Sequence, residues 1–244
     1  MKVKIVAPIT TKSFEEETQG EALQFVSPGT DVDTECIEFG TASIESAYDE
    51  ALCVPGILKV CEKAQNDGYD GVFISCMGDP GVSAAREQLD IPVVGPARAS
   101  MLFAADLSHK FSIVTVLKNV IVLLEELVAG VGLERKLASV RSVEIPVLAL
   151  EDKEKVAKAI VSESLKAIEE DGAHSIIFGC TGMIGVSEQV ERGLLDKGYE
   201  VPVIYPVPVA IKYLETLIAL KLTQSKETYM PPPEKQRNIW DRLQ

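Results

Sequence analysis

The chain contains a long internal repeat, which limits the folds that it can adopt. The segment "DGYDGVFISCMGDPGVSAARE", residues 67–87, aligns with "DGAHSIIFGCTGMIGVSEQVE", residues 171–191, at an offset of 104 residues. Eight of the 21 aligned positions are identical, including a cysteine and the two glycines that follow it. This period is far too long for a solenoid. The repeat therefore predicts two duplicated lobes.

Short β-rich runs alternate with longer helical patterns in both halves of the chain. The runs "GVFIS" and "SIIFG" are continuously apolar, as in strands whose sheet is buried on both faces. This alternation is typical of an α/β fold with a parallel sheet covered by helices. We predict strands at 2–8, 35–39, 71–75, 91–95, 110–116, 140–146, 174–179 and 201–206. We predict helices at about 46–66, from 81, and at about 120–131, 152–170 and 209–221.

Composition restricts the class of partner. The 244 residues carry 24 Lys and Arg against 37 Asp and Glu, a net charge of -13, so a nucleic-acid partner is not expected. The N-terminal "MKVKIVAPIT" has an apolar run too short for a signal peptide. No stretch is long and apolar enough for a membrane span. We expect a cytoplasmic protein whose hydrophobic residues, 46% of the chain, fill a sizeable core.

The cysteines and histidines do not form a disulfide or metal pattern. Five cysteines is an odd number, and none of them has Cys-x-x-Cys spacing. The two histidines, His109 and His174, are not spaced as zinc ligands usually are. We therefore expect neither a disulfide framework nor a metal, and no other cofactor.

Two of the cysteines occupy equivalent positions in the repeat. Cys76 and Cys180 each end an apolar strand, and ligands of parallel α/β sheets bind beyond that end. Gly78 and Gly182 follow two residues later and let the backbone turn sharply, with N–H groups directed at the sulfur. A helix N-terminus after the turn would lower the thiol pKa from about 8.5. Each turn is thus a candidate base.

Two such turns facing one cleft would place a thiol on either side of one small molecule. One thiolate could remove a proton from an acidic carbon while the opposite thiol donates one to the other face, which is racemisation without a cofactor. Backbone N–H groups could hold the enolate oxygen. A lone cysteine at a strand end is more often inert packing. That reading applies to Cys36, Cys53 and Cys61, which lack the turn.

Several motifs in order resemble the Asp/Glu/hydantoin racemase superfamily, and most closely its hydantoin and allantoin racemase branch. The likeness covers nearly the whole chain. The motifs are "GTASIESAYDEALCVPG" from Gly40, "CMGDPGVSAARE" from Cys76, "FSIVT" from Phe111, "IPVLALE" from Ile145, "GCTGM" from Gly179 and "SKETYMPPPEK" from Ser225.

The resemblance implies two Rossmann-like lobes related by a pseudo-twofold axis, with the active site in the cleft between them. It implies lobe 1 at 1–97, lobe 2 at 98–207, and residues 208–244 packed back on lobe 1. Cys76 and Cys180 would be the acid/base thiols. The candidate substrate contacts are Pro8, Ile9, Thr10, Ser43, Met77, Gly78, Thr115, Thr181, Gly182 and Pro206.

Departures from the branch bear on the substrate. Relatives commonly have Asn-Pro-Asn-Thr where this chain has Ala7 to Thr10, Val116 replaces a frequent threonine, and Tyr205 stands where an aspartate is common. Arg98 reverses the charge of a frequent glutamate. An apolar pocket with a cation would suit a ring bearing an apolar or acidic arm. Alternatively, Arg98 is a solvated helix residue.

We interpret the chain as an isomerase, a cofactor-independent racemase of a 5-substituted hydantoin or allantoin. An aspartate or glutamate racemase is the alternative within the fold, and a decarboxylase would retain only one of the two cysteines. A non-catalytic module that binds a small ligand and a thiol redox protein are alternatives of other classes. Redox chemistry needs the two Cα atoms within about 7 Å. The expected partners are a small-molecule substrate and further copies of the chain.

The last segment, with prolines at 231–233, is expected to be an extended tail with Trp240 docked on a lobe or a neighbouring subunit, or a solvated tail.

Overall fold

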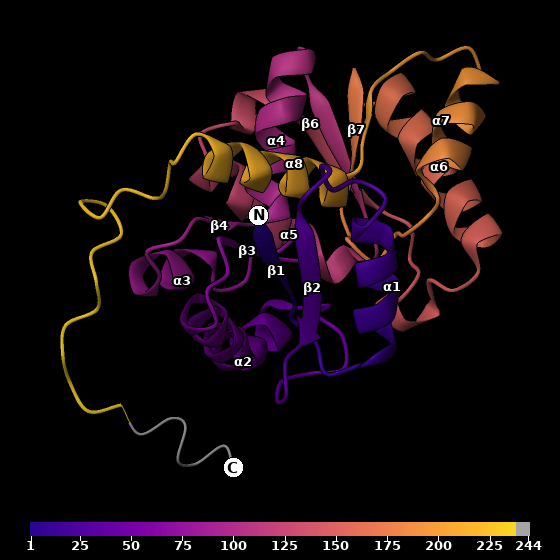
Figure 1. The fold of residues 1–244 in the computed structure, drawn as a ribbon. Helices are drawn as coiled ribbons and strands as arrows, with labels where there is room; N and C mark the ends of the chain where they lie inside the picture. The colour runs from indigo at the N-terminus through magenta and orange to yellow at the C-terminus, as the bar shows by residue number, and fades with distance from the viewer. Residues whose placement is uncertain (238–244) are drawn as a thin grey trace.

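A computed structural model describes residues 1–237 of the chain and shows two four-stranded parallel sheets (Figure 1). The first has the order β2-β1-β3-β4 and the second the order β6-β5-β7-β8. The strands are β1 (Lys2–Ala7), β2 (Asp31–Cys36), β3 (Gly71–Ile74), β4 (Val93–Val94), β5 (Phe111–Thr115), β6 (Leu137–Ser142), β7 (Ser175–Phe178) and β8 (Val203–Ile204). The second sheet repeats the strand order of the first, which confirms the predicted two-lobed α/β fold.

Helices cover both sheets. They are α1 (Ser13–Ala22), α2 (Ala47–Asn66), α3 (Val82–Gln88), α4 (Pro96–Leu107), α5 (Ile121–Gly130), α6 (Lys153–Glu169), α7 (Ser187–Leu195) and α8 (Pro206–Ala219). Short 3₁₀ turns lie at Lys118–Val120, Glu134–Lys136 and Val147–Ala149. The two longest helices begin at side-chain caps, because Ser46 and Asp152 accept hydrogen bonds from backbone N–H groups in the first turns of α2 and α6. Every residue of β3 and β7 is buried, as their apolar sequences predict.

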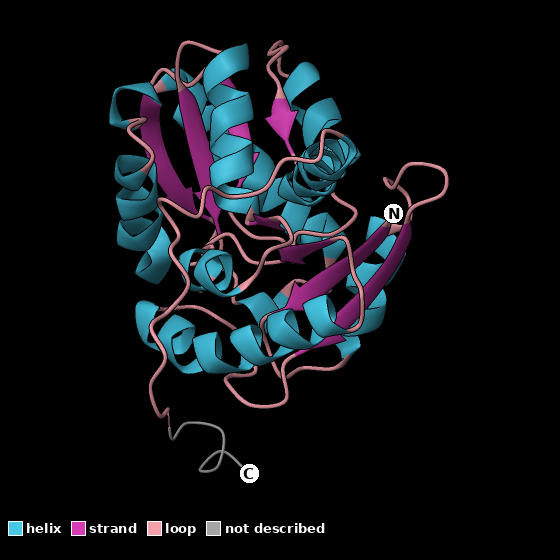
Figure 2. Ribbon diagram, turned by 60° about the vertical axis from the view of Figure 1, so that its left-hand side comes forward, coloured by secondary structure: helices cyan, strands magenta, loops and turns pink. Residues whose placement is uncertain are grey.

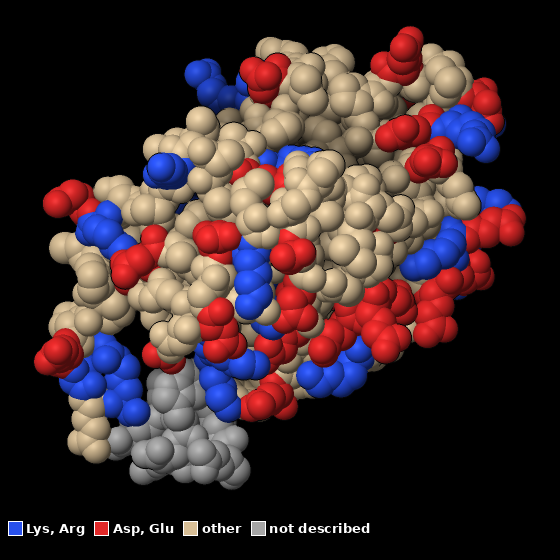
Figure 3. Space-filling model, viewed as in Figure 1, with Lys and Arg blue, Asp and Glu red and all other residues tan. Residues whose placement is uncertain are grey.

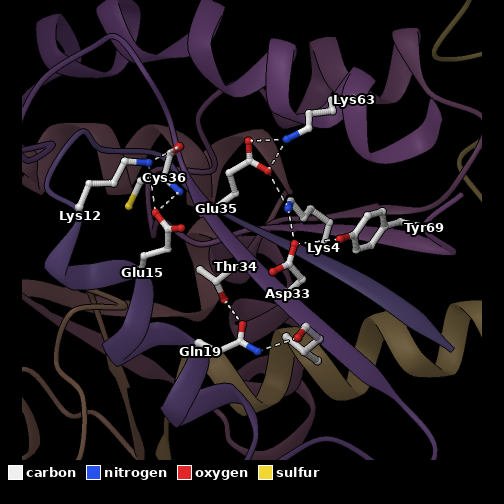
Figure 4. Close-up of polar contacts among 11 residues, drawn as sticks. Lys4, Lys12, Glu15, Gln19, Asp33, Thr34, Glu35, Cys36, Lys63 and Tyr69 are labelled. Carbon is white, nitrogen blue, oxygen red and sulfur yellow. Dashed lines mark hydrogen bonds and ion pairs between the residues drawn. The ribbon is translucent and has the colours of Figure 1, made fainter. Parts of the chain in front are cut away.

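The second strand lies earlier in the chain than predicted. It spans Asp31–Cys36 instead of residues 35–39, and it is an edge strand paired only with β1. Its residues alternate between exposed or half-buried acids and the buried Val32, Thr34 and Cys36, a pattern that lacks the continuous apolar run of the central strands. Figure 4 shows Lys4 of β1 between two of these acids, Asp33 and Glu35. Similarly, β6 begins three residues before its predicted start at 140.

Helix α1, which the sequence analysis did not predict, covers the outer edge of β2. The Gln19 side chain donates to the backbone carbonyl of Val32 at 2.6 Å, and the Cys36 N–H donates to the Glu15 carboxylate at 3.2 Å (Figure 4). These side chains occupy positions that a further strand would otherwise fill, so they protect an edge that could pair with another chain. The helix is predominantly polar and has no wide apolar stripe, which explains why its sequence did not indicate it.

Two helices connect the lobes. Helix α4 follows β4 of the first sheet but packs on β5, β7 and β8 of the second, and α8 follows β8 but packs on β3 and β4. The two helices also pack on each other. Buried Glu215 on α8 accepts hydrogen bonds from Ser27 and Thr30 in the loop before β2, at 2.7 to 2.8 Å. The division at residue 97 and the assignment of residues 208–244 to lobe 1 remain predictions.

The chain after α8 runs beside residues 86–93. The Gln224 amide donates to the carbonyls of Leu89 and Ile91, and the Lys226 ammonium donates to the Leu89 carbonyl at 2.7 Å. The Tyr229 hydroxyl accepts a hydrogen bond from Arg86 at 3.1 Å. The described part of this tail, up to residue 237, contains no helix or strand. The predicted docking of Trp240 concerns a residue outside the described range.

The surface carries the acidic excess of the composition. In Figure 3 acidic side chains gather at the lower right, where Figure 1 shows α1, whose first turn contains Glu15 and Glu16. Across residues 1–237 we find no helix with the length and apolar character needed to cross a bilayer. The same residues contain no group of three or more His, Cys, Asp or Glu side chains that could hold a metal ion.

Candidate active site

The two repeated cysteines lie where the sheets face each other. Cys76 follows the last residue of β3 by two positions, and Cys180 follows the last residue of β7 by two. Figure 2 shows strand arrowheads of both sheets pointing toward the middle of the molecule. Both residues are half-buried and neither is in a disulfide. The other three cysteines are free and buried, as predicted for core residues.

The cleft contains two cavities, and both cysteines line both of them. The two cavities also share Ile44 and Thr181. The first is further lined by Ala7, Pro8, Ile9, Phe14, Thr18, Ser75, Val147 and Gly182. The second is further lined by Glu50, Met77, Gly78, Thr115, Val116, Val120, Leu123, Leu124 and Gly179. Both cysteines therefore adjoin the same space, as they must if each is to exchange a proton with one substrate bound between them.

The predicted substrate contacts divide into two groups. Seven of the ten line a cavity with the cysteines: Pro8, Ile9, Met77, Gly78, Thr115, Thr181 and Gly182. The other three line neither cavity. The Thr10 N–H donates to the Thr41 carbonyl, the Ser43 carbonyl accepts from the Thr41 hydroxyl, and Pro206 is buried at the start of α8. Whether any of the ten contacts substrate remains a prediction.

The Thr115 and Arg98 side chains have different surroundings, and only Thr115 lines a cavity with the cysteines. The Thr115 hydroxyl donates to the carbonyl of Gly179 at 3.0 Å, so it holds the residue that precedes Cys180. Arg98 is exposed on α4 and lines neither of the two cavities. Its position agrees with a solvated helix residue and does not supply a cation beside the cysteines.

The surroundings of the thiols raise their pKa values. Burial raises the pKa of Cys180 to about 11, with a further contribution from Glu45. Burial also raises the pKa of Cys76 well above its usual value, and Glu50, the Cys180 thiolate and Asp79 add to the shift. The N–H groups of the following glycines act in the opposite direction; the Gly182 N–H lies 3.3 Å from the Cys180 sulfur. The thiols interact electrostatically, so their ionisations are coupled.

The aspartate of the Cys76 motif caps the start of α4, a helix that begins further along the chain. Asp79 accepts hydrogen bonds from the N–H groups of Ala97 and Arg98, at 2.9 and 3.1 Å, in the first turn of α4. Gly95 leaves room for this contact, because a Cβ there would lie 2.3 Å from an Asp79 oxygen. Burial raises the pKa of Asp79 to about 6, although the α4 N–H groups and the two nearby arginines favour the ionised form. Asp79 thereby ties the Cys76 turn to the helix that packs on the second sheet.

Two hydrogen bonds cross the cleft beside the cysteines. The Val147 N–H of the second half donates to the Glu45 carboxylate at 2.6 Å, and the Thr181 hydroxyl donates to the Ser75 carbonyl at 3.0 Å. Glu45 belongs to the "SIES" segment, whose neighbouring Ile44 lines both cavities. The bond to Val147 therefore ties the "SIES" segment of the first half to the second half.

The sequence analysis did not single out several residues that line the cavities. They are Phe14, Thr18, Ile44, Glu50, Val147, Val120, Leu123 and Leu124. For Glu50 a signal exists, because it precedes the buried Cys53 and Ile57 of α2 by three and seven residues, which places a carboxylate on the apolar face of the helix. Phe14 and Thr18 had no such signal, since their helix was not predicted.

Fold and site together define a class of protein: a two-lobed α/β protein with paired free cysteines in the cleft between duplicated halves. A family model described as Asp/Glu/Hydantoin racemase matches residues 3–214. The chain belongs to the Asp/Glu/hydantoin racemase family, and the resemblance seen in its sequence is confirmed.

Individual relatives match over nearly the full chain. A hydantoin racemase of Pseudomonas sp. (strain NS671) is 37% identical over 238 residues, covering 97% of this chain and 94% of that protein. The structure of allantoin racemase from Klebsiella pneumoniae matches with a TM-score of 0.91 and 33% identity, covering 100% of this chain and 98% of that one. Allantoin racemase from Pseudomonas fluorescens matches with a TM-score of 0.90 and 33% identity, covering 97% and 99%.

Proposed function

We propose that this protein is a cofactor-independent racemase of a hydantoin-like substrate, a 5-substituted hydantoin or allantoin, with Cys76 and Cys180 as its two acid/base groups. The observation that carries the proposal is that both thiols line the same two cavities between the duplicated halves. The similarity to a hydantoin racemase and to allantoin racemases over nearly the full chain supports the substrate class.

In the proposed reaction, one cysteine thiolate takes the proton from the stereogenic carbon beside a carbonyl group. The C–H electron pair moves into an enolate, whose oxygen the backbone N–H groups of the turns stabilise. The opposite thiol then gives its proton to the other face of the carbon. The configuration inverts, the two cysteines exchange protonation states, and no electron is gained or lost.

The two thiols take opposite roles in one turnover. Burial raises the pKa of both Cys76 and Cys180, so protonated thiols predominate at neutral pH in the unliganded protein. The cysteine that is ionised would act as the base toward the enantiomer whose C–H faces it, and the other would act as the acid. In the reverse reaction the two cysteines begin with the opposite protonation states.

The test is incubation in deuterated water with single enantiomers of 5-substituted hydantoins, allantoin, aspartate and glutamate. Optical rotation follows racemisation, and mass spectrometry follows deuterium entering at the stereogenic carbon. We expect racemisation of a hydantoin or allantoin, with deuterium in the inverted product. Racemisation of only aspartate or glutamate, or binding of hydantoins without turnover, would overturn the proposal.

Single cysteine variants separate the two roles. We expect Cys76→Ser and Cys180→Ser each to abolish racemisation. The remaining thiol should still exchange the proton of the one enantiomer that faces it, with configuration retained, and the two variants should select opposite enantiomers. Cys61→Ser is the matched control, because Cys61 is buried in the lobe 1 core away from both cavities. A Cys76 or Cys180 variant that racemises as fast as the control would disprove the role of that thiol.

A further inference from the structure

A carboxyl group without a partner lies beside Cys76. Oxygen Oε1 of Glu50 is buried and has no hydrogen-bond partner. No hydrogen bond or ion pair joins the Glu50 carboxyl to any side chain or backbone group of residues 1–237. Glu50 lines the second cavity together with both cysteines. A buried polar oxygen without a donor is unfavourable, so this group requires an explanation.

The turn after Cys76 is built to make room for this carboxyl. A Cβ at position 78 would lie 1.8 Å from Oε1 of Glu50, and Gly78 does not have the positive φ that favours glycine. Gly78 is therefore required by space and not by backbone conformation. The carboxyl lies directly against the backbone that follows Cys76.

The second copy of the turn lacks a carboxyl at the equivalent place. A Cβ at Gly182 would meet Cδ1 of Leu150 at 3.2 Å and the Cys180 sulfur at 3.4 Å. The repeat therefore places equivalent glycines beside two different side chains, an acid near Cys76 and a hydrocarbon near Cys180. This asymmetry places a carboxyl oxygen directly against Gly78 and hydrocarbon at the equivalent position of the Cys180 turn.

We propose that Glu50 binds the N–H group attached to the stereogenic carbon of the substrate and thereby orients that carbon between the two cysteines. The inference rests on the proposed function. A hydantoin ring carries an N–H on the atom bonded to its stereocentre and a carbonyl on the other side. With the N–H bound to Glu50, the ring would be oriented so that its two faces are directed at the two thiols. The C–H bond would project toward one thiol, and the opposite face of the enolate would be open to the other.

The chemistry of a carboxyl group fits this role. Its oxygen accepts a hydrogen bond whether the group is ionised or protonated. A substrate N–H would supply the donor that the unliganded protein lacks. A site built to bind a substrate N–H discriminates strongly against an analogue without it, because its polar group is then left unpaired. Glu50 would accordingly act as a specificity-determining residue that contacts substrate.

The test compares one hydantoin with its analogue methylated on the ring nitrogen next to the stereocentre. For the parent protein we expect kcat/KM to be about tenfold or more higher for the N–H compound. Glu50→Ala should remove this preference, since it deletes the acceptor and makes space for the methyl group. Glu50→Gln should retain part of the preference, because its amide oxygen still accepts. Glu62→Ala, an exposed position on the same helix, is the matched control and should leave the preference unchanged.

A second pair of variants tests the position of the Glu50 carboxyl by changing glycines instead of Glu50. Gly78→Ala would place a methyl group where Oε1 lies and displace the carboxyl, so it should also reduce the preference for the N–H compound. Gly20→Ala, at an exposed position of α1 where a Cβ would meet no atom within 4 Å, is the control and should leave the ratio of the two substrates intact. The effects of Gly78→Ala and Glu50→Ala on this ratio should not add, because both remove the same contact.

The outcomes distinguish this inference from the proposed function. A parent protein that racemises neither compound would overturn the proposed function. Racemisation with an equal N–H preference in the parent and Glu50→Ala would overturn the role of Glu50 alone. Equal loss of rate for both compounds in Glu50→Ala would indicate a purely structural role and also overturn it. If Glu50→Ala does not fold, the ratio in Glu50→Gln decides, and an unchanged ratio there counts against the inference.

Discussion

The Thr181 hydroxyl donates a hydrogen bond of 3.0 Å to the Ser75 carbonyl, so the residue after Cys180 is bonded to the residue before Cys76. The contact joins two segments that are 106 positions apart in the chain. It links the equivalent turns of the duplicated halves directly. The spacing of the two thiols is therefore held by a bond between their immediate neighbours and not by the packing of the lobes alone.

Thr181→Val should loosen this connection. The substitution removes the hydroxyl but keeps the shape of the side chain, and it leaves the Ser75 carbonyl without its donor. We expect a loss of about 1 kcal/mol in the free energy of unfolding and a several-fold fall in racemisation rate. Urea unfolding and the optical assay measure the two effects. Thr181→Ser, which retains a hydroxyl, should restore both, and a Val variant with normal stability and rate would show that the bond is unimportant.

The rate of racemisation should rise with pH. Burial holds the pKa of the Cys180 thiol at about 11, so between pH 7.5 and 9 only a small fraction of the base is ionised. Each unit of pH should increase that fraction, and kcat/KM with it, by about tenfold. The profile is measured with a substrate that does not itself ionise in this range. A flat or falling profile would contradict a thiolate base with a raised pKa.

Glu50 should make the protein less stable as the pH rises. Burial, aided by the Asp79 charge, raises the pKa of Glu50 to about 7, whereas the unfolded chain has a pKa of about 4.3. Between these values the folded state binds more protons, so stability falls with increasing pH. Glu50→Gln should therefore gain stability relative to the parent between pH 5 and pH 8. Chemical unfolding at both pH values provides the comparison, with Glu62→Gln as control; an identical pH dependence of Glu50→Gln and the parent would be the contrary result.

Asp79→Ala should destabilise the start of α4. Asp79 accepts from two N–H groups of that helix, and losing a helix cap costs about 1 kcal/mol, within a range of about 0.5 to 2. Asp79→Asn should retain most of the stability, because its amide oxygen can still accept and asparagine tolerates the positive φ of 48° at this position. Thermal unfolding ranks the three proteins. Equal melting temperatures for the Ala variant and the parent would show that the cap contributes nothing.

Apolar runs made the central strands predictable. β3 and β7 are buried along their full length, so burial on both faces produced an unbroken apolar pattern. β2 was displaced in the prediction, and α1 was missed, because both lie at an edge. Their side chains are satisfied by contacts such as Gln19 with Val32, which depend on partners that are distant in the chain and leave no periodic signal.

The candidate site was predictable in part for the same reason. Cys76 and Cys180 stood out because duplication repeated a turn whose glycines are visible in the sequence. Glu50 lies on the apolar face of α2 but also in the first turn of that helix, where the helix dipole favours negative charge, so its position in the sequence does not by itself identify it as a site residue. Only the approach of α2 to the Cys76 turn, with Glu50 against Gly78, shows that this carboxyl reaches the cavity.

The sequence by itself determined that the chain forms two similar α/β halves and that each ends a central strand in a cysteine turn, because these features are local and occur twice. Only the tertiary structure decided that a hydrogen bond between Thr181 and Ser75 joins the two turns and that α4 and α8 each cover the opposite sheet. It also decided that an acid lies against Gly78 of one turn and a leucine against Gly182 of the other. Such relationships depend on contacts between residues far apart in the chain, and on packing that differs between the two copies of one repeated motif.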